Sequence, residues 1–190
     1  MILPTIDSTS LAGVFRIVPR RFGDERGFFS ESWNAAALAE AGLVLPDFVQ
    51  DNHSLSRDIG TVRGLHFQSP PHAQGKLVRC GRGRLFDVAV DVRRGSPTFG
   101  QWYGEELSFE NGHQLWIPAG FLHGFMTLEP DTEIVYKVTD IYAPDCDGAV
   151  RWDSAGIDWP LTEVTPILSS KDEAAQALAD FDSPFTWEAP

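Results

Sequence analysis

Short runs of alternating apolar and polar residues, separated by glycine and proline, cover most of this 190-residue chain. The clearest run, RLFDVAVDV at residues 84–92, places phenylalanine and valines on one face and leucine, alanine and two aspartates on the other. Such alternation is typical of a β-strand, whose successive side chains point to opposite faces. Many short strands at this spacing predict an all-β sandwich or barrel, with jelly-roll geometry among the options.

Helix signals are confined to two places. The first is residues 34–41, where Asn34 is a plausible N-cap and Gly42 a plausible stop, and the second is residues 170–179. No linker, internal repeat or low-complexity tract interrupts the chain. We therefore expect a single domain over residues 1–190, with two short peripheral helices. Further strands are predicted at residues 13–18, 28–33, 48–54, 62–68, 76–80, 101–107, 114–117, 124–128 and 133–139.

The charge balance excludes several partners. The chain has 15 Lys and Arg against 27 Asp and Glu, a net charge of −12, which argues against a nucleic-acid or anionic-membrane surface. No apolar run approaches the roughly 20 residues of a membrane span. The first ten residues, MILPTIDSTS, lack the basic start of a signal peptide, so we expect a cytoplasmic protein. Cys80 and Cys146 have no zinc-type spacing, and we expect free thiols rather than a disulfide.

His66 is the first candidate functional residue. In the predicted strand at residues 62–68 it shares a face with Gly64 and Gln68, which fits either a pocket histidine or a hydrogen-bonded structural one. Leu65 and Phe67 then lie on the opposite face. Burying them requires a second layer, such as a subunit partner.

Lys76 and Tyr136 also allow two interpretations each. Lys76 begins an apolar strand, so it is either a solvated strand end or a buried positive charge suited to stabilising an oxyanion. Tyr136 shares a strand face with Ile134 and Val138 and therefore points inward. It is either a core tyrosine or a residue whose hydroxyl meets a partner in a pocket.

The turn at residues 116–125, WIPAGFLHGF, contains a P-x-G-x-x-H run that resembles the second half of the cupin metal signature. The first half of that signature needs two histidines spaced H-x-H, whereas this chain has His66-Phe67-Gln68. A catalytic metal normally takes three protein ligands, so we expect no metal site.

Arginines recur in this acidic chain, in RRFGDERGFFSE at residues 20–31 and at several later positions. Because arginine binds phosphate oxygens in a bidentate manner, they could build a phosphate site. No Walker loop or G-x-G-x-x-G motif supports ATP or dinucleotide chemistry. The later positions are Arg57, Arg63, Arg79, Arg82 and Arg84.

Eight segments occur in an order that resembles the dTDP-4-dehydrorhamnose 3,5-epimerase family, cupin-fold enzymes of deoxysugar biosynthesis. The resemblance covers residues 13–172 and implies a cupin jelly roll, a homodimer and no cofactor. It also implies epimerisation at C3 and C5 of dTDP-4-dehydro-6-deoxy-D-glucose, giving dTDP-4-dehydro-L-rhamnose. The segments are FGDERGFF (22–29), QDNHS (50–54), RGLHFQ (63–68), QGKLVR (74–79), FDVAVD (86–91), SPTFGQW (96–102), QLWIPAGFLHGF (114–125) and LSSKD (168–172).

The resemblance also implies roles for single residues. His66 corresponds to the base and Asp172 to the carboxylate that holds it, while Tyr136 is the acid and Lys76 stabilises the enolate oxygen. Tyr142 falls where an aromatic ring stacks on thymine. Asp147 stands where the family often has glutamate, and its shorter side chain is expected to weaken a contact to the nucleotide without changing the reaction. The remaining substrate contacts fall on Arg26, Glu31, Gln50, Asn52, Arg63, His123 and Lys171.

Three other functions remain open from the sequence. A metal-dependent cupin oxygenase requires bound iron, and a non-catalytic sugar-binding cupin binds the nucleotide sugar without exchanging its protons. A single-site epimerase or ketoisomerase of a related dTDP-deoxysugar pathway uses the same pocket but deprotonates a different carbon. The order of reaction at C3 and C5 is also left open.

Overall fold

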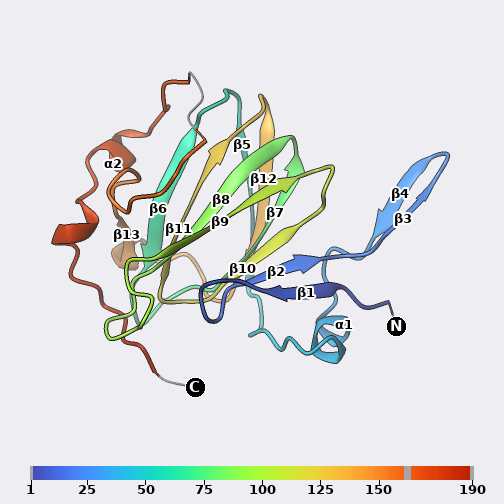
Figure 1. Cartoon of the computed structure of the whole chain (residues 1–190), viewed down its shortest axis with the longest axis horizontal. Coiled ribbons are helices and arrows are strands. Elements are labelled where there is room, and N and C mark those ends of the chain that lie inside the picture. Colours follow the sequence, from blue (N-terminus) through green and yellow to red (C-terminus); the bar gives the residue numbers. More distant parts are fainter. Residues whose placement is uncertain (1, 161–163, 189–190) are drawn as a thin grey trace.

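Two antiparallel sheets face each other in the computed structural model, which describes residues 2–160 and 164–188 (Figure 1). Neither sheet closes on itself, so the all-β prediction is confirmed as an open sandwich rather than a closed barrel. The first sheet has the order β1 (Thr5–Ser8), β2 (Phe15–Val18), β10 (Gln114–Ile117), β7 (Lys76–Arg82), β12 (Thr132–Val138), β5 (Gln50–Ser56). The second has the order β13 (Asp147–Ala149), β6 (Val62–Gln68), β11 (Phe121–Thr127), β8 (Arg84–Asp91), β9 (Trp102–Ser108).

The central core lies between the two sheets. The inward face of β8 contributes Leu85 and Ala89, which pack with Val78, Leu115 and Ile134 of the opposite sheet. Alternation along each strand therefore also fixes which polar side chains point inward. Lys76 and Tyr136 belong to the same inward faces as Val78 and Ile134.

A second core covers the outer face of the second sheet. There Leu65 and Phe67 pack against apolar side chains from the chain's own C-terminal part, including Phe181 and Phe185. The rings of Phe67 and Phe181 lie 5.0 Å apart between centroids. The second layer that the sequence required is therefore supplied by this chain, and the suggestion of a subunit partner there was wrong. Figure 1 shows this segment running beside β6.

The predicted helices are shorter than expected. Helix α1 (Ala35–Glu40) begins where Asn34 Oδ1 accepts a hydrogen bond from the Ala37 N–H, 3.1 Å away, as an N-cap should. Helix α2 covers only Ser170–Glu173, so the prediction of a helix to residue 179 was wrong. Past α2 the chain is drawn into a β-bridge, because the Arg151 N–H donates to the Gln176 carbonyl. Two 3₁₀ turns, η1 (Pro144–Cys146) and η2 (Leu178–Asp180), complete the helical segments described.

Most strand predictions are confirmed to within three residues, although β11 begins at Phe121 and not at residue 124. Strands β1 and β13 had no predicted counterpart. The hairpin strand β3 (Arg21–Asp24) was also missed, and its partner β4 (Gly27–Ser30) ends earlier than predicted. Residues 31–33 then connect the strand to Asn34, which caps α1. The β3–β4 hairpin projects from the sandwich (Figure 1).

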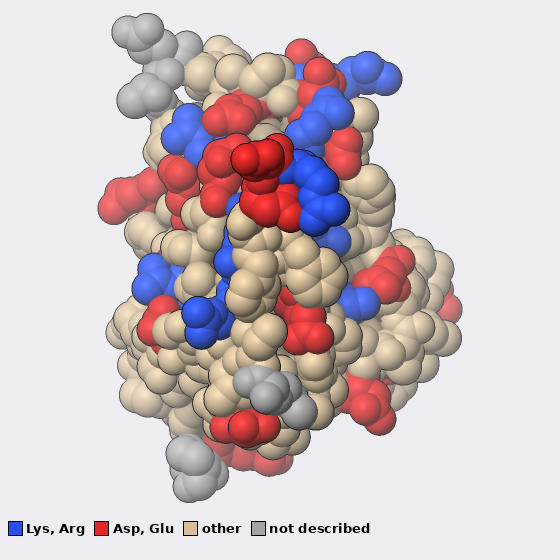
Figure 2. Space-filling model, turned by 90° about the vertical axis from the view of Figure 1, so that its right-hand side faces the viewer, with Lys and Arg blue, Asp and Glu red and all other residues tan. Residues whose placement is uncertain are grey.

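Both cysteines are free, as predicted. Within residues 2–160 and 164–188, no helix is long and apolar enough to cross a membrane. On the side from which the β3–β4 hairpin projects, Lys and Arg side chains lie next to Asp and Glu side chains (Figure 2). Acidic neighbours therefore balance the positive charge locally on this face.

Candidate active site

A pocket of about 190 Å³ opens between the sheets and gathers most of the predicted functional residues. His66 reaches it from β6, Lys76 from the start of β7 and Tyr136 from β12. Gln50 and Asn52 of β5 line it as well. Tyr142 and Asp147 also line it, together with Phe67, Gln68 and Gln74.

His66 forms a close pair with Asp172. The His66 Nε2 atom lies 2.5 Å from Asp172 Oδ1, and the Asp172 residue is only 2% exposed. Ser169 caps α2 and donates its hydroxyl to Asp172 Oδ2 at 2.8 Å. The motif Ser-x-x-Asp thus starts a helical turn and holds the carboxylate at the same time.

The Asp172 carboxylate is stabilised as an anion. Burial by itself raises the pKa of Asp172, but the hydrogen bond and charge of His66 and the hydrogen bond from Ser169 lower this pKa further than burial raises it. An ionised Asp172 accepts the Nε2–H of His66 and leaves Nδ1 with a lone pair. His66 can therefore accept a proton at Nδ1.

Two glycines allow β6 to approach β11 closely beside His66. A Cβ atom added to Gly64 would lie 2.7 Å from the Cα of Gly124, and Gly64 has φ +120°. Both features exclude a side chain at this position. The glycines of RGLH and HGF therefore set the strand spacing on which the position of His66 depends.

Lys76 is a half-buried residue whose ammonium group is enclosed among the residues that line the pocket. Burial lowers its pKa to about 8, although the charges of Asp147 and Asp87 act in the opposite direction. At neutral pH its ammonium group is still protonated. A positive group in a low-dielectric pocket is suited to stabilising a developing oxyanion.

Tyr136 faces the pocket from the sheet opposite His66. Burial raises its pKa, and the nearby positive charge of Arg63 opposes that effect. The phenol is therefore a proton donor at neutral pH. Arg63 is held nearby because its Nε donates to Ser56 Oγ at 3.2 Å. A histidine that can accept a proton and a tyrosine that can donate one thus lie on opposite sheets and line one pocket with Lys76.

The mouth of the pocket contains polar groups that were predicted as substrate contacts. Gln50 donates to Asn52 Oδ1 at 2.7 Å. Lys171 forms an ion pair with Asp147, which joins α2 to β13. Tyr142 is 56% exposed and leaves its ring open to a ligand.

His123 is placed differently from the other predicted contacts. It pairs in register with His66 across β11 and β6, but its side chain is only 9% exposed and bonds to Asp87 Oδ1 at 2.7 Å. Asp87 was not predicted from the sequence. Its position as an inward-facing aspartate in the apolar strand 84–92 was the available signal.

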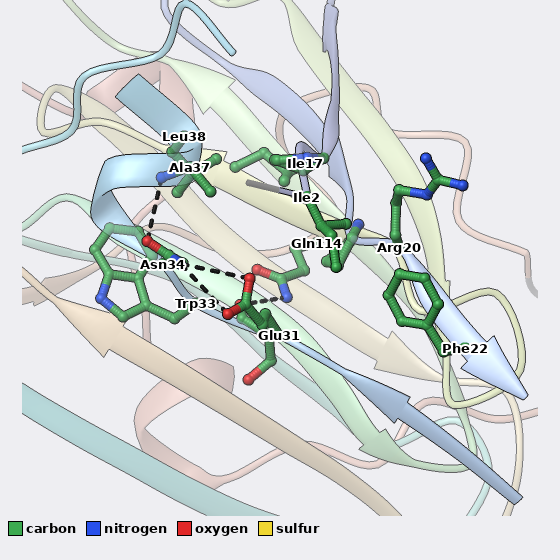
Figure 3. A pocket seen from close by; sticks show the side chains of 13 residues that line it. Ile2, Ile17, Arg20, Phe22, Glu31, Trp33, Asn34, Ala37, Leu38 and Gln114 are labelled. Carbon is green, nitrogen blue, oxygen red and sulfur yellow. Dashed lines mark hydrogen bonds between the residues drawn. The ribbon is translucent and has the colours of Figure 1, made fainter. Parts of the chain in front are cut away.

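Arg26 and Glu31 lie away from the pocket in this chain. Arg26 sits at the turn of the β3–β4 hairpin, with a 90% exposed side chain that pairs with Asp24. Glu31 lines a separate cavity of about 30 Å³ beside α1, where Asn34 donates to its carboxylate at 3.4 Å (Figure 3). A single chain therefore does not bring these two residues to the other contacts.

In the part of the chain that the structure describes, no cluster of three or more His, Cys, Asp or Glu side chains could hold a metal ion. The two histidines of the cupin-type signature, His66 and His123, each bond instead to a carboxylate.

Two open sheets with a pocket that holds a His–Asp pair, a buried lysine and an opposing tyrosine define a cupin-like enzyme of the acid–base type. The family model for dTDP-4-dehydrorhamnose 3,5-epimerase matches residues 8–180. A protein of that name from Sinorhizobium fredii is 55% identical over 95% of this chain and 92% of its own length. The chain therefore belongs to the dTDP-4-dehydrorhamnose 3,5-epimerase family.

Solved structures agree with this assignment. A dTDP-6-deoxy-D-glucose-3,5-epimerase from Legionella pneumophila, in complex with dTDP-4-keto-L-rhamnose, superposes with a TM-score of 0.91. It is 46% identical and the match covers 98% of this chain and 100% of that one. A 3'-monoepimerase from Streptomyces bikiniensis, in complex with dTDP-quinovose, is 35% identical with a TM-score of 0.83, covering 90% of this chain and 86% of that one.

Proposed function

We propose that this chain epimerises C3 and C5 of dTDP-4-dehydro-6-deoxy-D-glucose, giving dTDP-4-dehydro-L-rhamnose. The observation that carries the proposal is one pocket with a base on one sheet, an acid on the other and a buried cation. Relatives named for this reaction are 55% and 46% identical to the chain over more than nine-tenths of its length.

The chemistry of the substrate explains why these groups suffice. C3 and C5 both flank the C4 ketone, so the electron pair left by a removed C–H proton moves onto the ketone oxygen as an enolate. In the proposed mechanism His66 takes the proton, Lys76 stabilises the oxyanion and Tyr136 returns a proton from the other face. The C–H bond is broken and re-formed with inverted configuration, and no electrons are gained or lost.

A single-site epimerase is the second candidate. It is supported by the fold shared with the 3'-monoepimerase, but that protein is only 35% identical. The two functions are separated by incubating the substrate in deuterated water and reading the label by NMR. The proposal expects deuterium at both C3 and C5, and label at one carbon only would establish the single-site enzyme.

Tyr136→Phe tests the assignment of the acid. The variant keeps the aromatic ring but lacks the hydroxyl that donates the proton. His66 can still remove a C–H proton and return one to the same face of the sugar. We expect deuterium exchange to continue while net conversion to the L-configured product falls much further, by about 10²-fold or more.

Tyr103→Phe is the matched control, because its hydroxyl bonds to Glu105 at 2.6 Å and Tyr103 is not among the pocket's lining residues. This variant should convert substrate normally. Equal losses of exchange and conversion in Tyr136→Phe would show that Tyr136 supports the pocket and is not the acid.

We also propose that the protein acts as a homodimer in which the partner's hairpin completes the nucleotide site. The support is that Arg26 lies on a projecting hairpin whose Phe28 and Phe29 are 45% and 66% exposed. Mixing inactive His66→Ala with inactive Arg26→Ala should then restore activity, because one site of each mixed dimer has both residues. A monomeric mass in solution, together with no recovery of activity in the mixture, would contradict the proposed dimer.

Two further expectations remain proposals. We propose that residues 1–190 fold as one domain, which predicts a single cooperative unfolding transition. We also propose a cytoplasmic location, which the two free cysteines support, because thiols persist in a reducing compartment.

A further inference from the structure

A loop at residues 140–143 presents Tyr142 at the mouth of the pocket. It follows β12 and precedes η1, and it belongs to no strand or helix. The Tyr142 side chain is more than half exposed, so packing does little to fix it. The Tyr142 hydroxyl donates to Asp147 Oδ2 at 3.4 Å. The position of its ring therefore depends on this one bond and on what holds the backbone of the loop.

Gln68 holds that backbone at two points and also binds the His72 carbonyl. Its residue is only 4% exposed and follows His66 on the inward face of β6. The Gln68 Nε2 donates to the carbonyls of His72 at 2.7 Å and Ile141 at 3.1 Å. Its Oε1 accepts from the Ala143 N–H at 2.8 Å.

Two other glutamines bind the same loop. The Tyr142 N–H donates to Gln50 Oε1 at 3.0 Å, and Gln74 Nε2 donates to the Asp140 carbonyl at 2.7 Å. Each of the four loop residues thus has one backbone group bonded to a glutamine amide. Gln68 binds on both sides of Tyr142, which makes it the central member of this set.

We propose that Gln68 is a positioning residue for nucleotide binding, acting by fixing the 140–143 loop so that Tyr142 faces the nucleobase. The inference rests on the proposed function, because the base is the ligand that Tyr142 would meet. Only a side-chain amide supplies two donors and an acceptor of this shape. A glutamine is therefore required here, whereas glutamate or methionine loses at least the two donors.

Gln68→Met tests the proposal because it keeps the length of the side chain and removes all three hydrogen bonds. Of its glutamine bonds the loop then keeps only those to Gln50 and Gln74, so it is less ordered and the nucleotide must restrict it on binding. We expect the dissociation constant for dTDP and the KM for the dTDP-sugar to rise by about tenfold or more, with kcat changed by less than about threefold. Hydrogen exchange of the Ala143 amide should accelerate in the same variant.

Ser183→Ala is the matched control. Ser183 is also buried and ties a loop to the sandwich through the Val92 carbonyl, but it is not among the lining residues of the pocket. It should leave dTDP binding unchanged. Gln68→Glu is a second variant that keeps an acceptor for Ala143 and loses both donors, and it should raise KM as well.

The possible outcomes distinguish a failure of the positioning role of Gln68 from a failure of the proposed reaction. Unchanged Ala143 exchange, or faster exchange with normal dTDP affinity, would overturn the proposal. A fall in kcat at constant KM would also overturn it, by showing that Gln68 acts through His66. If Tyr142→Ala leaves dTDP binding intact, the role given to Tyr142 is wrong. If the wild type exchanges no deuterium, the proposed reaction fails whatever the loop does.

Discussion

Replacing Lys76 with methionine should make this protein more stable and almost inactive. Methionine keeps the apolar stem of the side chain and removes the buried ammonium group. The free-energy cost of burying that charge is visible in its pKa, which burial lowers from the ordinary 10.5 to about 8. A group retained at such a cost in stability is expected to serve the reaction.

The size of the effect follows from that pKa. The difference between 10.5 and about 8 corresponds to roughly 3 kcal/mol at about 1.4 kcal/mol per pH unit. Water in the pocket screens the charge, so this value is an upper bound. Below about pH 8 the lysine is protonated in both the folded and the unfolded chain, and the full cost is present.

Stability should therefore depend on pH in a defined direction. Between about pH 8 and pH 10.5 the unfolded chain binds more protons at Lys76 than the folded chain does. The contribution of this residue to the free energy of unfolding consequently rises with pH across that window. The methionine variant should lack this rise.

Urea unfolding of wild type and variant at pH 7 and at pH 10 measures these differences, and deuterium incorporation at C3 and C5 measures the chemistry. We expect Lys76→Met to be more stable at pH 7, to lose most of that advantage by pH 10, and to exchange about 10²-fold more slowly or worse. Lys137→Met is the control, because that lysine pairs with Asp51 at 2.9 Å outside the pocket that holds His66. A variant that is destabilised at pH 7, or that keeps normal exchange, would refute the reasoning.

Two further substitutions examine the His–Asp pair. His66→Ala should abolish deuterium entry at C3 and C5 together, by about 10²- to 10⁴-fold, because one base serves both carbons; wild-type exchange at either carbon would remove His66 from this role. Asp172→Asn should fold and bind dTDP but turn over far more slowly, because the amide cannot stabilise the imidazolium; unchanged turnover at neutral pH would remove Asp172 from the mechanism.

Much of the site was predictable because strand alternation decides which side chains point inward. His66, Lys76 and Tyr136 each lie on strands whose boundaries the sequence predicted to within two residues, and all three reach one pocket. From the residues alone, each also had a structural interpretation. Only the meeting of three strands from two sheets, which depends on long-range pairing, favours the functional interpretation.

Other parts of the site depend on contacts that no local pattern encodes. Asp87 is hydrogen-bonded to His123 of the neighbouring strand β11. Gln68 binds the Ile141 carbonyl and the Ala143 N–H, which lie more than 70 positions later in the chain. Such partners are set by register and loop path, which alternation does not specify. The positions of Arg26, on the hairpin, and Glu31, just after it, could not be predicted for a related reason. A strand pattern does not say in which direction a hairpin projects.

The C-terminal segment connects stability to catalysis. Phe181 and Phe185 cover the outer face of the second sheet, next to Phe67, while Asp172 on α2 reaches the inward-facing His66. Phe67 and His66 are neighbours on β6 and point to opposite faces, so one segment buries the first and orients the second. If the C-terminal segment detaches from the outer face of the second sheet, α2 should move with it. The His66–Asp172 pair is therefore expected to weaken before the sandwich itself unfolds. The apolar alternation that folds the second sheet thus also requires the segment that holds His66 through Asp172.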